Sequence, residues 1–448
     1  EPVHSPYCSL PVLVRKPDGT FRMCLDFRAL NAVTVKSNYP LPNAAANLSA
    51  MGTASIFTTL DLLQGFFQCE LLPEARLKTA FATPWGQMAY TRMPMGLTSS
   101  PGTFMMLVDA ALAGLKPGIA LAYVDDVIIP TDGDLRAHLA DVKEVFNRFI
   151  ECGFKARCDK VHIGKDEVPY LGFLCSKVGT RPDPKKTEAV VKMSAARMYN
   201  DPAAAARFAG MITFYSRFIP NCAIMLGPLH DLKQKGGLER APEIMQRMRF
   251  NCAVTALVTA LANVTALARP DFNKPFNVDV DAATLGGGGA ALTQREVEHD
   301  PFTAKPLAFW SRRFSQQERR YPVRDQECLA LVESVLEWHP YLHGAPGTIV
   351  RTDHRSLAWL LTTHHAPGSR VANWAIKLSN YDLKIVHVAG KDNVVPDCFS
   401  RAFPEPGVDE EADLGNAIFI AVPVHQRRLP RTCNITIGPQ LHAPNGIV

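Results

Sequence analysis

The residues of this chain that most clearly point to chemistry are Tyr123-Val124-Asp125-Asp126, where two carboxylates stand side by side between apolar runs at 119–122 and 127–129. Two short apolar runs that meet at a polar tip predict a β-hairpin with the acids at its turn. Adjacent carboxylates repel each other, so the pair suits a site for a multivalent cation such as Mg²⁺. An isolated Asp-Asp pair more often closes a surface turn. The surrounding sequence must decide between these two interpretations.

A third carboxylate lies on a separate predicted strand. The run 56–62 is apolar and carries one acid, Asp61. If this strand lies beside the hairpin, Asp61, Asp125 and Asp126 form a three-carboxylate site. Such a site suits phosphoryl transfer with two Mg²⁺ ions about 3.5–4 Å apart, which hold the attacking and leaving oxygens. Mn²⁺ is the alternative ion.

A second set of acids occupies the last part of the chain. Asp281, Glu327 and Asp353 lie at strand ends or on a helix, and Asp397 comes near the start of a short helix. Each acid alone is best explained as a solvated surface residue. Together they could gather around a second pair of metal ions.

Periodicity predicts the elements that carry these acids. Apolar residues at 139–150 recur at helical spacing and predict a helix packed on the sheet, with Leu139 and Ile150 on its buried face. Strands are predicted at 171–174 and 348–352, and a helix at 324–338. The four glycines 286–289 are expected to loosen the strand pair that follows Asp281.

Several motifs around the acids occur in one order and spacing, and together they closely resemble the reverse transcriptase and ribonuclease H portion of gypsy-type (Metaviridae) LTR-retrotransposon Pol polyproteins. The resemblance runs from about Ser5 to Arg401. It rests on Leu10-Pro11-Val12-Leu13-Val14, Arg22 to Asn31, Tyr39-Pro40-Leu41-Pro42, Leu60-Asp61-Leu62, Lys78-Thr79-Ala80-Phe81, Met93-Pro94-Met95-Gly96-Leu97, Val280-Asp281-Ala282, Thr352-Asp353-His354 and Asp392 to Arg401.

The resemblance implies an α+β, multidomain fold, in which a right-hand polymerase of fingers, palm and thumb precedes an α/β ribonuclease H-like domain. Residues 1–178 would be fingers and palm, with the upstream part of the fingers missing, and residues 179–268 the thumb and connection. Residues 269–401 would be the ribonuclease H-like domain, entered through a polar linker at 269–275. A flexible tail is expected at 402–448.

The resemblance also assigns roles in nucleotide binding. Arg22 and Lys16 would clamp the triphosphate, because a guanidinium fork and an ammonium both match phosphate oxygens. Phe66 would lie under the sugar and exclude a 2′-hydroxyl, and Met95, which departs from the usual Phe or Gln of the family, would lie near the same sugar. Otherwise Arg22 and Lys16 are solvated and Phe66 is core.

The implied function is RNA-directed DNA synthesis at Asp61, Asp125 and Asp126, combined with hydrolysis of the RNA strand of a hybrid at the second acid set, with two ions in each site. The implied partners are an RNA template, a DNA primer, the RNA–DNA hybrid and dNTPs. The cytoplasm, including virus-like particles, is the expected location, with nuclear access of the product. Two alternatives stay open, an inactive nucleic-acid-binding remnant of a retroelement and a plant pararetrovirus polymerase. The oligomeric state is not predicted.

Composition is compatible with this interpretation. The 448 residues, 47% hydrophobic and 20% charged, are typical of a globular protein with two or three domains. The net charge of +5 permits a nucleic-acid partner without demanding one. Eleven cysteines without a Cys-x-x-Cys pair are expected to be free thiols, and no apolar run is long enough to predict a membrane span.

Overall fold

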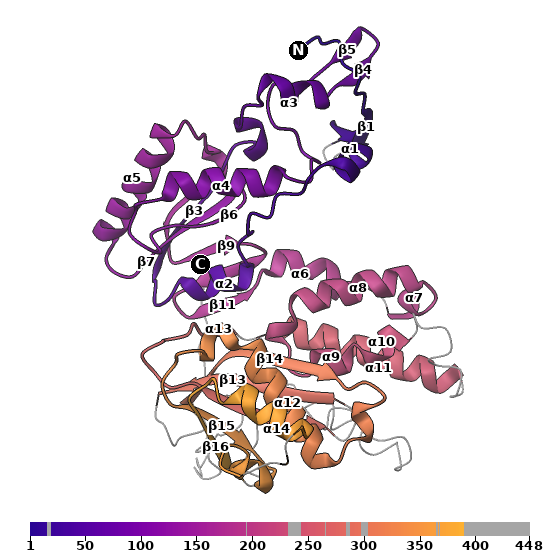
Figure 1. The fold of residues 1–448 in the computed structure, drawn as a ribbon, viewed down its shortest axis with the longest axis vertical. Coiled ribbons are helices and arrows are strands. Elements are labelled where there is room, and N and C mark those ends of the chain that lie inside the picture. The colour runs from indigo at the N-terminus through magenta and orange to yellow at the C-terminus, as the bar shows by residue number, and fades with distance from the viewer. Residues whose placement is uncertain are drawn as a thin grey trace, which may run out of the picture.

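The computed structural model describes residues 1–388, apart from 16–18, 194, 232–242, 265, 284–286, 297–302, 364–365 and 367. The N-terminal strands and helices lie at one end and a five-stranded sheet at the other (Figure 1). A four-stranded sheet and a helical segment lie between them. The prediction of a mixed α and β, multidomain fold is confirmed.

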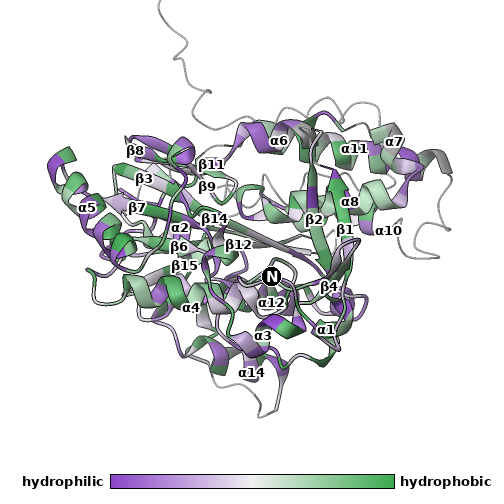
Figure 2. Cartoon of the chain, turned by 90° about the horizontal axis from the view of Figure 1, so that it is seen from above, coloured by the Kyte–Doolittle hydropathy of each residue, from purple (hydrophilic) through white to green (hydrophobic). Residues whose placement is uncertain are grey.

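The N-terminal end is built from two small antiparallel hairpins and short helices. Its elements are β1 (Leu10–Arg15), β2 (Phe21–Asp26), α1 (Arg28–Val33), α3 (Pro73–Lys78), β4 (Phe81–Thr83) and β5 (Gly86–Met88). The short helix η1 (Gly65–Gln68) packs instead on the core of the four-stranded sheet. A small core of Leu25, Phe27 and Phe81 holds the two hairpins together. β1 is hydrophobic along much of its length, yet Leu10 and Leu13 are exposed (Figure 2).

The four-stranded sheet has the order β6-β7-β3-β8 and is antiparallel throughout. A three-stranded sheet of order β11-β10-β9 follows it in the chain. The elements of this region are α2 (Ala44–Ala50), β3 (Ile56–Asp61), α4 (Ser100–Leu112), β6 (Leu121–Tyr123), β7 (Asp126–Thr131), α5 (Leu135–Glu151), η2 (Cys158–Lys160), β8 (His162–Lys165), β9 (Glu167–Tyr170), β10 (Phe173–Ser176) and β11 (Gly179–Pro182).

Two sequence predictions for this region need correction. The helix predicted at 139–150 is α5, which packs on β3 and β7 through Val142 and Val145, but Leu139 and Ile150 are 48% and 69% exposed. Both side chains therefore face solvent, whereas His138, Val142, Val145 and Phe149 form the buried face of α5. The strand predicted at 171–174 starts only at Phe173, because Leu171 and Gly172 form the turn between β9 and β10, with φ angles of 52° and 85°.

A helical segment continues the core of this region. Its helices are α6 (Pro184–Val191), α7 (Ala195–Tyr199), α8 (Pro202–Phe214), η3 (Ser216–Phe218), α9 (Cys222–Met225), α10 (Gly227–Asp231) and α11 (Glu243–Ala262). Buried side chains such as Phe57 of β3 and Phe208 of α8 belong to one hydrophobic cluster. Within the described part of the chain, no helix is long and apolar enough to cross a membrane.

The C-terminal sheet has the order β14-β13-β12-β15-β16, with β12, β15 and β16 parallel and β13 and β14 antiparallel. Its own core packs α12 on the sheet through Leu331 and Val335. The elements are β12 (Asn277–Ala283), β13 (Gly287–Arg295), β14 (Ala304–Arg313), η5 (Glu318–Arg320), α12 (Val323–Glu337), α13 (His339–Leu342), β15 (Thr348–Thr352), η6 (Arg355–Trp359), α14 (Arg370–Leu378) and β16 (Leu383–His387).

The glycines of β13 allow neighbouring helices to pack closely on this strand, contrary to the prediction that they loosen the strand pair. Gly288 is buried, and a Cβ on it would lie 2.7 Å from the Cβ of Ala330 on α12. A Cβ on Gly289 would lie 2.5 Å from the side-chain oxygen of Asn221. These glycines therefore let α12 and α9 approach the sheet closely. Gly286 lies outside the described residues.

The predicted linker at 269–275 begins with a strongly anchored residue. Arg269 donates hydrogen bonds to the carbonyls of Gly52, Ala54 and Ser176, and its guanidinium lies 4.9 Å from the centre of the Phe57 ring. The start of the linker is therefore held against the four-stranded sheet region.

Candidate active sites

Asp61 and Asp126 are direct cross-strand partners at the end of the β3–β7 pair. Two β-compatible runs place them there, since Ile56–Asp61 and Asp126–Thr131 pair along six positions. The predicted β-hairpin is confirmed as β6 and β7, with Tyr123 paired to Asp126. The three acids therefore lie together at one end of the strands of this sheet.

The hairpin turn holds Asp125 by contacts on both sides. Val124 has a φ of 57°, a left-handed conformation that is unfavourable for a β-branched residue. Its N–H donates to Sδ of Met105 at 3.0 Å, and the carbonyl of Asp125 accepts from the N–H of Leu62 at 2.9 Å. A Cβ on Gly65 would lie 3.4 Å from the Cβ of Asp125, so η1 packs close to the acid. The strained turn is thus fixed by its neighbours.

Lys160 is a site residue that the sequence reasoning missed. Its Nζ lies 2.8 Å from Oδ2 of Asp61, and this ion pair joins η2 to the end of β3. The N–H of Arg157 also donates to the carbonyl of Asp61 at 2.9 Å. The sequence feature that could have pointed to Lys160 was a basic cluster, Arg157 and Lys160, on the segment after α5.

The electrostatics show that the carboxylates are crowded. Partial desolvation, followed by the negative charges of Asp125 and Asp61, raises the pKa of Asp126 to about 6. Lys160 and Lys186 oppose this shift. Because the side chain of Asp126 is exposed to solvent, we attribute its raised pKa more to repulsion by the neighbouring carboxylates than to desolvation.

Hard carboxylate oxygens and excess negative charge fit a divalent cation. However, among the described residues no three His, Cys, Asp or Glu side chains are arranged to hold one. Asp61 is instead paired with Lys160. The chemistry of the donors suits Mg²⁺ or Mn²⁺, but in this structure Lys160 takes the place of a cation beside Asp61.

The predicted nucleotide-binding residues are spread over two elements and a loop. Arg22 is exposed on β2, and Lys16 lies outside the described residues. Phe66 is half-buried, with its ring edge to face with Phe104 at 5.6 Å between centroids. Met95 is 41% exposed. Phe66 therefore has a packing role whatever else it does.

The Met95 loop is fixed by a residue to which the sequence reasoning gave no separate role. Asn31 donates to the carbonyl of Gly96 at 2.8 Å and accepts from the N–H of Thr98 at 2.9 Å. Gly96 has a φ of 98°, a conformation that favours glycine. Asn31 thus ties α1 to the loop that carries Met95.

The second acid set is described only in part. Glu327 of α12 is 4% exposed, and its Oε2 accepts from the N–H of Ala282 at 3.2 Å, one residue beyond Asp281. Asp353 is exposed directly after β15, which is parallel to β12. The side chain of Asp281 and the whole of Asp397 lie outside the described residues. The predicted strand 348–352 and helix 324–338 are confirmed as β15 and α12.

Asp279 is a buried acid that sequence reasoning also missed. Its Oδ1 lies 3.8 Å from guanidinium nitrogens of both Arg295 and Arg351, which links β12 to β13 and β15. Burial raises the pKa of Asp279, and the two arginines counteract that effect. The signal in the sequence was the period-two spacing of Asp279 from Asp281, which is the spacing of residues that share one face of a strand.

Comparisons with protein families give two matches within this chain. The model described as reverse transcriptase (RNA-dependent DNA polymerase) matches residues 14–175, which include Asp61, Asp125 and Asp126. The model described as the RNase H-like domain found in reverse transcriptase matches residues 271–381, which include Asp281, Glu327 and Asp353.

Curated relatives carry both regions in one polypeptide. The retrovirus-related Pol polyprotein from transposon 297 of Drosophila melanogaster is 33% identical over 419 residues, covering 92% of this chain and 38% of that protein. The one from transposon gypsy of the same species is 30% identical over 417 residues, covering 89% and 39%. The chain thus spans 38–39% of the length of these two relatives.

Solved structures share the fold. A foamy viral protease-reverse transcriptase in complex with double-stranded DNA matches with a TM-score of 0.74 at 21% identity, over 87% of this chain and 66% of that chain. One in complex with an RNA/DNA hybrid matches with a TM-score of 0.70 at 21% identity, over 91% and 53%. At this level of identity, the likeness concerns the fold alone.

Proposed function

We propose that this chain is the reverse transcriptase and ribonuclease H portion of a gypsy-type LTR-retrotransposon Pol polyprotein, and that it copies RNA into DNA and degrades the RNA strand of the hybrid. The matches to the reverse transcriptase and RNase H-like family models and the similarity to the transposon gypsy polyprotein support this proposal. The observation that carries this proposal is the cross-strand pairing of Asp61 with Asp126, with Asp125 at the adjoining turn. Three carboxylates at one sheet edge are the donor set that two-metal nucleotidyl transfer requires.

In the polymerase site, Asp61, Asp125 and Asp126 would hold two Mg²⁺ ions, or Mn²⁺. When bound, these ions activate the primer 3′-hydroxyl and neutralise charge on the leaving pyrophosphate. Since the pKa of Asp126 is raised to about 6, its carboxylate is mostly ionised at neutral pH and able to act as a ligand, whereas protonation below about pH 6 would weaken metal binding. Lys160 must release Asp61, and its ammonium is then free to face the substrate phosphates.

Nucleotide binding would draw on residues from the N-terminal end. Arg22 is exposed on β2 and available to the triphosphate, and Lys16 would contribute from the same hairpin. Phe66 lies in η1, which packs against Asp125, so it is placed close to the reacting centre. Phe66 and Met95 would together limit the space at the sugar.

In the nuclease site, Asp281, Glu327, Asp353 and Asp397 would hold the second ion pair. Glu327 is already fixed beside β12 by the N–H of Ala282. Shape and 2′-hydroxyl groups distinguish a hybrid from double-stranded DNA, so the proposed substrate is the RNA strand of an RNA–DNA duplex.

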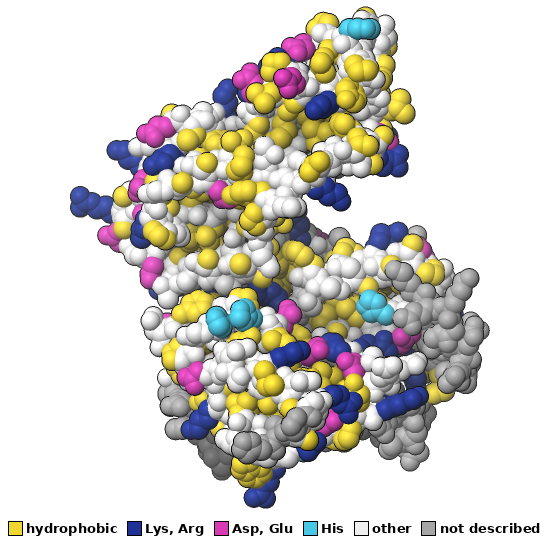
Figure 3. All heavy atoms as spheres, viewed as in Figure 1, with side chains coloured by type: hydrophobic (Ala, Val, Ile, Leu, Met, Phe, Trp, Pro, Cys, Tyr) yellow, Lys and Arg dark blue, Asp and Glu magenta, His cyan; other side chains and the backbone are white. Residues whose placement is uncertain are grey.

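The surface offers a path for the template and primer. Figure 3 shows a hollow between the N-terminal end and the helical segment α6–α8, with Lys and Arg side chains on its rim. A basic rim favours binding of a phosphate backbone. Foamy viral proteins of similar fold bind double-stranded DNA and an RNA/DNA hybrid. We place the activity in the cytoplasm or in virus-like particles.

The test is extension of oligo(dT) on poly(rA), together with cleavage of a labelled RNA–DNA hybrid. Asp125→Asn should abolish extension and retain hybrid binding, whereas Asp166→Asn, an exposed acid on the turn between β8 and β9, should leave extension unchanged. Glu327→Gln should stop RNA cleavage and spare extension. Glu337→Gln on the same helix serves as its control. Wild-type-like extension by Asp125→Asn would contradict the polymerase assignment.

A further inference from the structure

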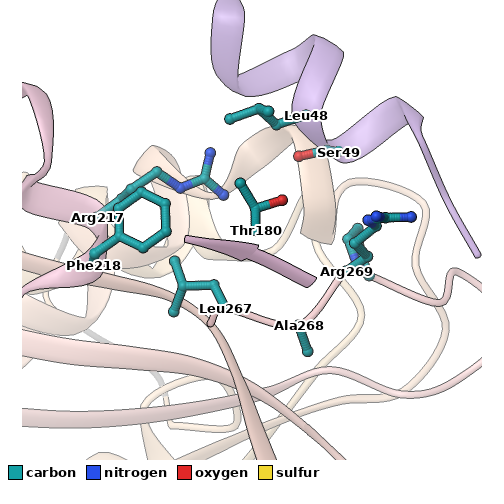
Figure 4. A pocket seen from close by; sticks show the side chains of 9 residues that line it. Leu48, Ser49, Thr180, Arg217, Phe218, Leu267, Ala268 and Arg269 are labelled. Carbon is teal, nitrogen blue, oxygen red and sulfur yellow. The ribbon is translucent and has the colours of Figure 1, made fainter. Parts of the chain in front are cut away.

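A small pocket lies where the helical segment, α2 and the linker meet (Figure 4). Two arginines, Arg217 of η3 and Arg269, contribute to its lining, together with the hydroxyl residues Ser49 and Thr180. The other lining residues are apolar, and none is acidic. The pocket therefore collects two positive charges without a carboxylate in its wall.

Arg217 is incompletely satisfied at this pocket. Its Nε and Nη1 atoms are buried and have no hydrogen-bond partner among the described residues, and Nε of Arg269 is in the same condition. In Figure 4 the guanidinium of Arg217 points toward Thr180 and the centre of the group. A guanidinium keeps its charge at any physiological pH, so it cannot avoid this cost by losing a proton.

The remaining nitrogen of Arg217 is part of an oriented chain of hydrogen bonds. Nη2 donates to the hydroxyl of Tyr341 at 3.3 Å, and that hydroxyl lies 2.6 Å from Oγ of Ser49. Ser49 in turn donates to the carbonyl of Ala45 at 2.9 Å. Because Arg can only donate and a carbonyl can only accept, Tyr341 must donate to Ser49. This series of hydrogen bonds therefore joins η3, α13 and α2, but it supplies no negative charge to Arg217.

The size of the pocket limits what can complete it. Its volume of about 10 Å³ corresponds to one water molecule, so a halide ion, which is somewhat larger, requires a small outward shift of the lining side chains. Phosphate and carboxylate ions are too large. A water molecule can accept from two N–H groups at most and leaves the buried charge uncompensated. A halide accepts from several donors and compensates the charge.

We propose that this pocket is a binding site for a small monatomic anion, with chloride as the physiological occupant, held by Nε and Nη1 of Arg217 beside Arg269. The bound anion completes the coordination of Arg217 and so stabilises the junction between α2 and the domain that contains Tyr341. This proposal is independent of the catalytic assignments.

The solution test is thermal unfolding of the full chain at constant ionic strength while sodium gluconate is replaced by sodium chloride. Wild type should show a saturable rise in melting temperature. At chloride ten times Kd, the folded form gains about elevenfold in its equilibrium with the unfolded form. Arg217→Met should lose this response. Arg207→Met, on α8 and 66% exposed beside Asp201, should keep it.

A chloride response that is absent in wild type, persists in Arg217→Met, or disappears in Arg207→Met would overturn the proposal. If Arg217→Met does not fold, crystals of the wild-type protein grown in sodium bromide decide the question. An anomalous bromide peak in contact with Nε and Nη1 of Arg217 supports the site. A water molecule there, without anomalous signal, overturns it.

Discussion

The ammonium of Lys160 lies 2.8 Å from Oδ2 of Asp61, although the two residues are 99 positions apart in the sequence. The lysine therefore occupies a position beside a carboxylate where a metal ion would have to bind. Removing it should strengthen metal binding to the free protein. We expect Lys160→Met to lower the Kd for Mn²⁺ by about 2–5-fold, the range typical of a partly exposed ion pair.

Isothermal titration without nucleic acid measures this change. Lys192→Met is the matched control, because Lys192 also pairs with a carboxylate, Glu188, and both of these side chains are exposed. An unchanged or weakened Mn²⁺ affinity in Lys160→Met would show that Lys160 does not compete with the metal.

The raised pKa of Asp126 predicts how stability depends on pH without metal. The folded-state pKa of about 6 lies above the ordinary value of 3.8 for an aspartate, so the folded form binds more protons between these values. The destabilising charge is therefore present above about pH 6 and is relieved as pH falls through 6. Asp126→Asn should be more stable than wild type at pH 7.5, by about 1 kcal/mol after allowance for solvent screening.

At pH 5 the advantage of Asp126→Asn should shrink, because wild-type Asp126 is then largely protonated. Thermal unfolding of both proteins in EDTA measures the difference, and comparing them removes the contributions of other titrating groups. A stability difference that does not change between pH 5 and pH 7.5 would contradict the assigned shift.

A substitution at Phe66 distinguishes contact with the substrate from packing as the role of this residue. If it lies under the incoming sugar, Phe66→Val should raise ribonucleotide use relative to deoxynucleotide use. The ratio of kcat/KM for dNTP and rNTP isolates this effect from loss of active protein. If its edge-to-face contact with Phe104 is its whole role, the ratio stays constant and stability falls by about 1–3 kcal/mol.

Gly288 should tolerate no side chain. A Cβ there meets the Cβ of Ala330 at 2.7 Å, so Gly288→Ala should destabilise the C-terminal domain by about 1–3 kcal/mol. Gly210→Ala in α8 is the control, since nothing lies within 4 Å of its added Cβ and helix propensity favours alanine by about 1 kcal/mol. Calorimetry of both variants tests the contrast. Equal stability would mean that β13 and α12 can separate without cost.

The sequence was sufficient to predict those elements that depend on residues close together in the chain. Two short apolar runs that meet at a polar tip located the Asp125 hairpin, and the strand ending before Asp353 was predicted at its observed bounds. Family resemblance then grouped acids from distant segments. Leu139 was wrongly assigned to the core, because helical periodicity shows an apolar stripe but not which of its residues the rest of the fold covers.

The contacts that sequence reasoning missed are long-range. The pairing of Lys160 with Asp61 and the cluster of Asp279 with Arg295 and Arg351 join residues of separate elements, so the sequence shows the charged residues but not their partners. The glycines of β13 were misjudged for a related reason. Flexibility is a property of glycine in an unfolded chain, whereas here α12 and α9 occupy the space that side chains would need.

Arg269 has a consequence for the order in which the protein folds. Its carbonyl partners Gly52, Ala54 and Ser176 precede it by 217, 215 and 93 residues, so the anchor closes long loops and cannot form until residue 269 has been synthesised. During synthesis these carbonyls must first be solvated by water. A polypeptide that stops at residue 268 would keep them so permanently, and the edge of its first domain would be left more open to proteases than in the longer chain.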